Sequence, residues 1–144
     1  MVSELRVRFS ASGHPNVRAA HKTTLEITSE SSLSERGDCI VAVGSDLTAA
    51  GLPEEVKEKI RSGARVTLTI SAGQYVDVVK GFGDPGLVLD GKKGMIFRKS
   101  GYLSPDTVAV KCDKSAANLD RGLVEELKKA GHVEFELKVE FDRD

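Results

Sequence analysis

The sequence carries one pattern twice, and this repetition limits the folds that the chain can adopt. Gly13-His14-Pro15 is followed 70 positions later by Gly83-Asp84-Pro85, and Val41-Ala42-Val43 is followed 67 positions later by Val108-Ala109-Val110. A period this long is typical of a duplicated supersecondary unit rather than of a short solenoid repeat. Features that both copies keep are therefore expected to be scaffold, and features of one copy are candidates for function.

Each copy is predicted to contain three strands, a helix and a final strand. Alternating apolar and polar residues indicate half-buried strands, and short apolar runs indicate buried ones. Pro53 suits the first turn of an amphipathic helix that ends at Gly63, and Gly131 ends the equivalent helix of the second copy. The predicted repeats span about 4–72 and 73–142.

The join between the copies is too short to be a flexible linker, so a single domain over residues 1–144 is predicted. The expected fold is mainly β with two helices, an α+β class. Tandem pseudo-symmetric βββαβ repeats would form either one closed barrel or a two-sheet sandwich, because neither copy can close a core alone.

Composition argues against several functional classes. The net charge of −1 and the absence of Trp give no electrostatic or stacking signature of a nucleic-acid binder. No apolar run approaches the roughly 20 residues of a membrane span, and the charged start is unlike a signal peptide. Two cysteines at unmatched positions predict reduced thiols. We expect a cytoplasmic protein without nucleic-acid or membrane partners, of undetermined oligomeric state.

Polar chemistry is concentrated in the first copy. His14 stands where the second copy has Asp84, and His21 stands where it has Gly91. The first copy also has three extra residues between Ser34 and Val41. The candidate catalytic residues are His14, His21, Asp38 and Cys39, and the candidate ligand-binding residues are Lys22, Thr23 and Thr24.

These residue types suit two kinds of chemistry. Imidazoles transfer protons near neutral pH or bind metals, and an imidazole beside Cys39 would lower the pKa of its thiol. Lys22 and the Thr hydroxyls could bind an anion. Their spacing matches no zinc signature, so a metal requirement stays open. Each residue also has a structural alternative, a turn role for His14 and Asp38 and a buried apolar role for Cys39.

Several stretches resemble the largely archaeal domain-of-unknown-function family 371. They are Gly13-His14-Pro15-Asn16-Val17, residues 21–28, Arg36-Gly37-Asp38-Cys39-Ile40-Val41 and Arg98-Lys99-Ser100. The resemblance spans nearly the whole chain. It implies a predominantly β fold and a compact intracellular protein, and it implies no activity.

Two functional hypotheses follow. The first is a polar cluster in the first copy that binds a small anionic molecule and could also transform it. The alternative is a non-catalytic structural or protein-interaction module whose polar residues only stabilise turns. Convergence of the imidazoles and the thiol in one place would favour the first.

Overall fold

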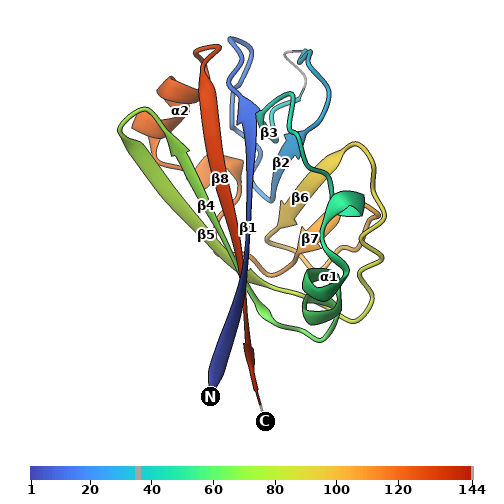
Figure 1. Cartoon of the computed structure of the whole chain (residues 1–144). Helices are drawn as coiled ribbons and strands as arrows, with labels where there is room; N and C mark the ends of the chain where they lie inside the picture. The colour runs from blue at the N-terminus through green and yellow to red at the C-terminus, as the bar shows by residue number, and fades with distance from the viewer. Residues whose placement is uncertain (35–36, 144) are drawn as a thin grey trace.

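A computed structural model describes residues 1–34 and 37–143, so two residues of the predicted insertion, 35 and 36, lie outside the described part. In chain order, the elements are β1 (Val2–Ser12), β2 (Thr24–Thr28), β3 (Ile40–Ala42), η1 (Ala49–Gly51), α1 (Glu54–Arg61), β4 (Arg65–Ala72), β5 (Tyr75–Phe82), β6 (Gly94–Arg98), β7 (Thr107–Ala109), η2 (Ala116–Asn118), α2 (Arg121–Leu127) and β8 (His132–Asp142). The fold is mainly β with two α-helices, as predicted (Figure 1).

The strands form two separate sheets of four strands each. The first sheet has the order β1-β8-β4-β5, and all its pairs are antiparallel. The second sheet has the order β3-β2-β6-β7, with an antiparallel central pair and short parallel outer pairs. The closed barrel was the wrong alternative, because the described strands link the sheets only through isolated bridges at Ser12–Val43 and Phe82–Val110. The arrangement is sandwich-like.

The core lies between the two sheets. Along β4 every second residue is buried, and Leu25 and Ile27 of β2 are fully buried on the facing side. This alternation follows from the period-two geometry of strands. The rings of Phe9 and Phe135 stack within the core, with 4.9 Å between their centroids.

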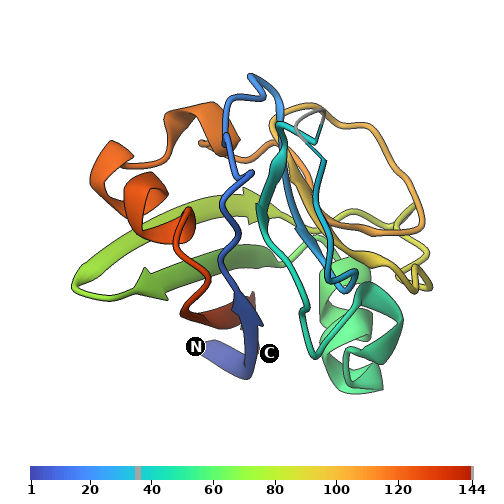
Figure 2. The same cartoon turned by 90° about the horizontal axis from the view of Figure 1, so that it is seen from above.

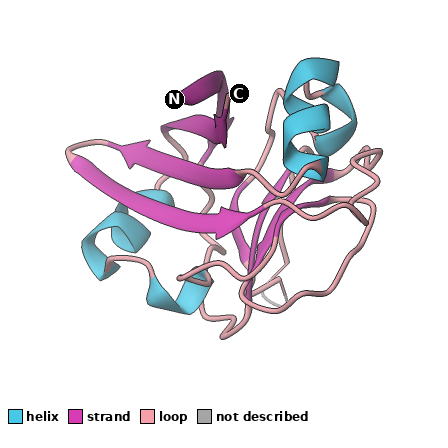
Figure 3. Ribbon diagram, turned by 90° about the horizontal axis from the view of Figure 1, so that it is seen from below, coloured by secondary structure: helices cyan, strands magenta, loops and turns pink. Residues whose placement is uncertain are grey.

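The helices lie at opposite sides of the sandwich (Figures 2 and 3). Helix α1 starts after Pro53 with two acidic residues and ends with two basic ones, which complements the helix dipole. Helix α2 is capped by Asp120, whose side chain accepts a hydrogen bond from the Leu123 N–H. It ends at Leu127, before the predicted end at Gly131.

The Gly-Pro turns after β1 and β5 pack against the ends of the helices. A Cβ atom at Gly83 would lie 1.9 Å from the carbonyl oxygen of Ile60, and one at Gly13 would lie 1.9 Å from that of Lys129. Only glycine lets the two backbones come this close. The glycine of each half therefore contacts the helical region of the other half.

The order of elements is the same in residues 4–72 and 73–142, yet the halves are interleaved in space. In the first sheet, β8 of the second half lies between β1 and β4 of the first half. Among the described residues, pairing between two strands of one half is limited to the short parallel pairs β2–β3 and β6–β7, apart from the isolated bridges Ser12–Val43 and Phe82–Val110.

Candidate functional site

The outer face of the second sheet carries the charged side chains of Glu26 and Arg98. In β2 the residues flanking Glu26 point into the core, whereas Glu26 itself lies on the opposite face and is half-buried. In β6 the corresponding outward positions are Ile96, directly opposite Glu26, and Arg98, directly opposite Thr24. The site is built around this central antiparallel pair.

Glu26 and Cys39 interact through side chain and backbone. The Cys39 Sγ lies 3.6 Å from the Glu26 Oε1 and donates a hydrogen bond to it, and the Glu26 N–H donates to the Cys39 carbonyl at 2.8 Å. Burial raises the pKa of Glu26, and the neighbouring Asp106 charge raises it further. Burial together with the Glu26 charge raises the pKa of the Cys39 thiol to about 12. At neutral pH the thiol is thus a hydrogen-bond donor to Glu26.

The guanidinium of Arg98 is held on one edge. Its Nε donates to the Thr107 hydroxyl at 3.0 Å, and its Nη2 donates to the Ser104 hydroxyl at 3.2 Å. The Tyr102 ring covers it, with 4.9 Å from Cζ to the ring centroid. Within residues 1–34 and 37–143, no carboxylate lies within ion-pair distance of Arg98 and Nη1 has no hydrogen-bond partner. The Nη1 edge is therefore held in one orientation but makes no hydrogen bond to the described residues.

Asp106 directly precedes β7 and lies near Glu26 and Arg98. Burial raises its pKa, although the Lys93 N–H and ammonium partly oppose this. Its Oδ1 occupies the space that a side chain at Gly91 would need, 1.6 Å from an ideal Cβ atom there. We call Glu26, Cys39, Arg98 and Asp106 the Arg98 cluster. Perturbed carboxyl pKa values beside a fixed cation are typical of functional sites.

The sequence-predicted residues are only partly brought together. The His21 Nδ1 accepts hydrogen bonds from the N–H groups of Thr23 and Thr24, and the His21 N–H donates to the Asp38 carbonyl at 3.2 Å. This imidazole therefore stabilises a turn, beside the segment that leads to Cys39. Lys22 is exposed next to it.

His14 is part of a different structural unit. Its Nδ1 accepts from the Asn16 N–H at 3.0 Å, and its own N–H donates to the carbonyl of Leu127 at the end of α2. Nothing in the described contacts joins this imidazole to His21, Asp38 or Cys39. In the described part of the chain, no three His, Cys, Asp or Glu side chains are arranged to hold a metal ion.

Sequence reasoning missed Glu26, Arg98 and Asp106. A signal for Glu26 was present, because a charge between two apolar residues of a buried strand must lie on the outer face of its sheet. Arg98 was part of a quoted family motif, but it was assigned no role. Asp106 stands 67 positions after Cys39, and both flank Glu26. The proximity of Arg98 and Asp106 to Glu26 depends on the pairing of β2 with β6.

The thiols offer a direct test of this environment. A pKa of about 12 instead of 9.0 lowers the thiolate fraction near neutral pH about a thousandfold for both Cys39 and Cys112. We expect iodoacetamide to alkylate the native protein far more slowly than the urea-unfolded protein, as measured by mass spectrometry over time. Rapid alkylation of Cys39 in the native state would contradict the half-buried Glu26–Cys39 contact.

Comparison with known proteins assigns the chain to a family. The model of the family described as "Domain of unknown function (DUF371)" matches residues 9–140. The chain belongs to this family. An uncharacterised protein of Methanocaldococcus jannaschii is 37% identical to it over 131 residues, covering 91% of this chain and 97% of that protein. The DUF371 match includes all of the second sheet, most of the first sheet and the whole Arg98 cluster. None of the described helices has the length and apolar character to cross a membrane.

Proposed function

We propose that this DUF371 protein binds a small carboxylic acid at the Arg98 cluster. The observation that carries the proposal is a guanidinium fixed by Thr107, Ser104 and Tyr102, with its Nη1 edge directed away from these partners. A carboxylate accepts two parallel hydrogen bonds from such an edge. The proposed ligand is an anion, as expected from the sequence, but the residue proposed to bind it is Arg98 instead of Lys22.

The charges of the cluster favour a singly charged ligand. One guanidinium stands against two carboxyl groups, Glu26 and Asp106, whose pKa values are both raised. A protonated Glu26 can donate a hydrogen bond to a bound anion, whereas an ionised Glu26 repels it. By linkage, affinity should rise as the pH falls through the pKa of Glu26, which lies above its ordinary value.

The test is a titration with formate, a carboxylate that stays ionised at the pH values above the ordinary pKa of a glutamate, where Glu26 is expected to titrate. We expect saturable shifts of the Arg98 Nε–H signal in NMR spectra, with millimolar affinity that improves toward lower pH. Arg8, whose Nε is paired with Glu136, provides the internal control signal. Arg98→Lys should weaken binding about tenfold, because a lysine cannot offer the two-pronged edge.

Glu26→Gln is the matched variant for the pH effect. It should leave formate binding in place and remove the part of the pH dependence that Glu26 causes, because the amide does not titrate; any remaining part would come from Asp106. A formate response that does not saturate, or one that is the same in wild type and Arg98→Lys, would contradict the proposal. The melting temperature of each variant distinguishes lost binding from lost folding.

We further propose that the two halves arose by duplication and form one domain. Matching hydrogen bonds support this: Ser10 and Asp46 exchange two bonds in the first half, and Lys80 and Asp113 exchange the same two in the second. The equal element order of residues 4–72 and 73–142 supports it as well. The duplication is tested by superimposing the Cα atoms of residues 4–72 on those of residues 73–142. A shared backbone path would support it, and different paths would contradict it.

A further inference from the structure

A hollow with several basic side chains lies on the open face of the first sheet. This face is turned to the viewer in Figure 1, and neither helix crosses it. At its β4–β5 side a hollow is lined by four basic side chains and one aromatic ring. We call these residues the basic hollow: Arg65, Lys80, Phe82, Lys111 and Lys138.

Strand register places these side chains around one patch. Lys80 on β5 and Lys138 on β8 are both directly opposite Thr67 on β4, so they flank it on the same face. With neighbouring strands about 4.8 Å apart, their Cα atoms are about 10 Å from each other. Phe82 is directly opposite Arg65 in the next row, and the residue is 46% exposed. Long basic side chains can converge across such a gap beside the ring.

The positive charge of the hollow is only partly neutralised. Among the described residues, no carboxylate lies within ion-pair distance of Arg65, Lys80 or Lys111. Lys138 is paired with Glu140 at 3.5 Å. Asp113 also lines the hollow, but one of its oxygens accepts the Lys80 backbone N–H. An excess of two positive charges results in a protein whose net charge is −1.

The corresponding positions of the other half lack these groups. At the offsets of 67 and 70, the counterparts of the four basic residues are neither Lys nor Arg, and the counterpart of Phe82 is Ser12. The counterparts of Arg65, Lys80, Lys111 and Lys138 are His132, Ser10, Gly44 and Ser71, respectively. The scaffold thus does not require the basic residues or the ring.

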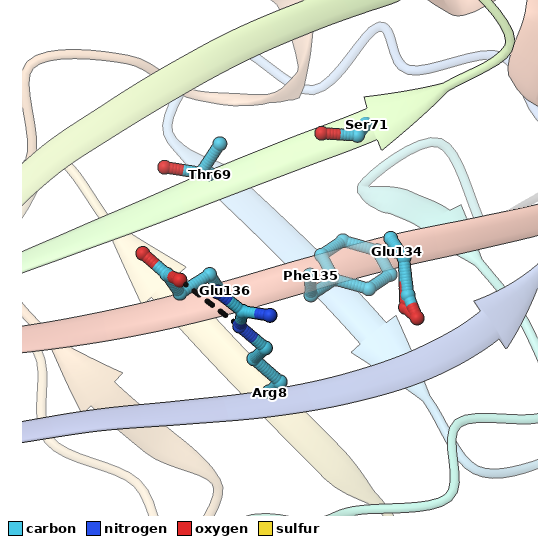
Figure 4. Close-up of a pocket in the computed structure, with 6 residues that line it drawn as sticks. All are labelled: Arg8, Thr69, Ser71, Glu134, Phe135 and Glu136. Carbon is cyan, nitrogen blue, oxygen red and sulfur yellow. Dashed lines mark hydrogen bonds and ion pairs between the residues drawn. The ribbon is translucent and has the colours of Figure 1, made fainter.

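A second hollow on the same face shows the contrast. It is lined by Arg8, Thr69, Ser71, Glu134, Phe135 and Glu136 (Figure 4). There the Arg8 Nε lies 3.3 Å from a Glu136 oxygen, and Glu134 adds another negative charge. This hollow has no excess positive charge and is not suited to an anion.

The backbone of Lys111, which lines the basic hollow, is strained. Its φ angle is +52°, in the left-handed region, and its counterpart Gly44 has a φ of +63°. Glycine adopts this conformation without strain, whereas a lysine does not. The second half therefore accepts a strained residue at the place where it contributes an ammonium group to the hollow. Strain of this kind concentrates at ligand sites.

We infer that the basic hollow binds a nucleoside monophosphate, with the phosphate between Lys80, Lys111 and Lys138 and the base against Phe82. Two or three ammonium groups match a dianionic phosphate, which a single guanidinium such as Arg98 does not. An exposed ring beside the cations provides a stacking surface for one base. The small number of aromatic residues around it favours a single nucleotide over a polynucleotide.

The experiment is calorimetric titration of the full chain with adenosine 5′-monophosphate, inorganic phosphate and adenosine. We expect the monophosphate to bind more tightly than either part. Lys111→Gly, which installs the residue of the first half, should weaken binding about tenfold and also raise the melting temperature, because the backbone strain is relieved. Phe82→Ser should bring the affinity for the nucleotide down to that for phosphate. Lys92→Ala, an exposed lysine outside the hollow, is the charge control.

Three results would overturn the inference. The first is nucleotide binding that Lys111→Gly leaves unchanged. The second is equal affinity for phosphate and nucleotide in the wild type, which would remove the role of Phe82. The third is affinity that grows with the length of an oligoadenylate and falls steeply with salt, which would indicate a single-stranded nucleic-acid surface instead.

Discussion

Gly83→Ala is expected to destabilise the protein by about 3 kcal/mol or more. The new Cβ would lie 1.9 Å from the carbonyl oxygen of Ile60, and both groups belong to backbone that cannot move alone. Relief of this clash would separate the turn after β5 from the end of α1 and weaken the 2.8 Å hydrogen bond from the Gly83 N–H to the Ala64 carbonyl. Urea unfolding followed by circular dichroism measures the loss, and the melting temperature should fall by about 10 °C.

Gly101→Ala is the matched control. No atom lies within 4 Å of an ideal Cβ at Gly101, and its φ angle lies outside the left-handed region. This variant should unfold at the same urea concentration as the wild type, or slightly higher, because alanine restricts the unfolded chain. Equal stabilities for the two variants would show that the contact between the Gly-Pro turn and the helix end does not constrain the fold.

Residues 1–72, produced alone, are expected not to fold. Their long strands β1 and β4 are separated in the first sheet by β8, so both lose their partner in the fragment. The pairing that remains between the described strands of this half is the short β2–β3 pair. The fragment should show no cooperative thermal transition, and neither should residues 73–144, in which β5 lacks β4.

Mixing the two fragments should restore a cooperative transition and the β-sheet circular dichroism signal. The restored pairs would be β1–β8, β4–β8 and β4–β5. The control is the full chain with a protease site inserted at the exposed Gly73-Gln74 turn and left uncut, which should fold like the wild type. A cooperative transition of residues 1–72 alone would contradict the interleaved arrangement and the proposal of one domain.

Local patterns predicted the elements well. Alternation placed the strands that contain Phe9, Ile27 and Val66, and proline and glycine placed the start and end of α1. These predictions were confirmed because strand and helix periodicities are properties of neighbouring residues. The predicted end of α2 was wrong, because Gly131 follows a short turn after Leu127 rather than the helix itself.

The polar residues were harder to place. His14 and His21 differ between the copies, yet each ring nitrogen accepts backbone hydrogen bonds within its own turn. A residue that differs between the copies can therefore stabilise a turn and need not take part in a reaction. Cys39 was predicted to lie beside an imidazole, but its hydrogen-bond partner is Glu26.

The amino-acid sequence by itself determined the mainly β class and the order of the elements, because each depends on a few neighbouring residues. The need for glycine at the turns after β1 and β5 came from the tertiary structure, where each turn meets the helical region of the other half. The tertiary structure decided that the halves interleave, that Glu26 and Arg98 share one sheet face, and that Lys80, Lys111 and Lys138 surround one hollow. These juxtapositions arise from pairing between strands far apart in the chain, such as β1 with β8. Their register is set by the shared core, not by any local pattern.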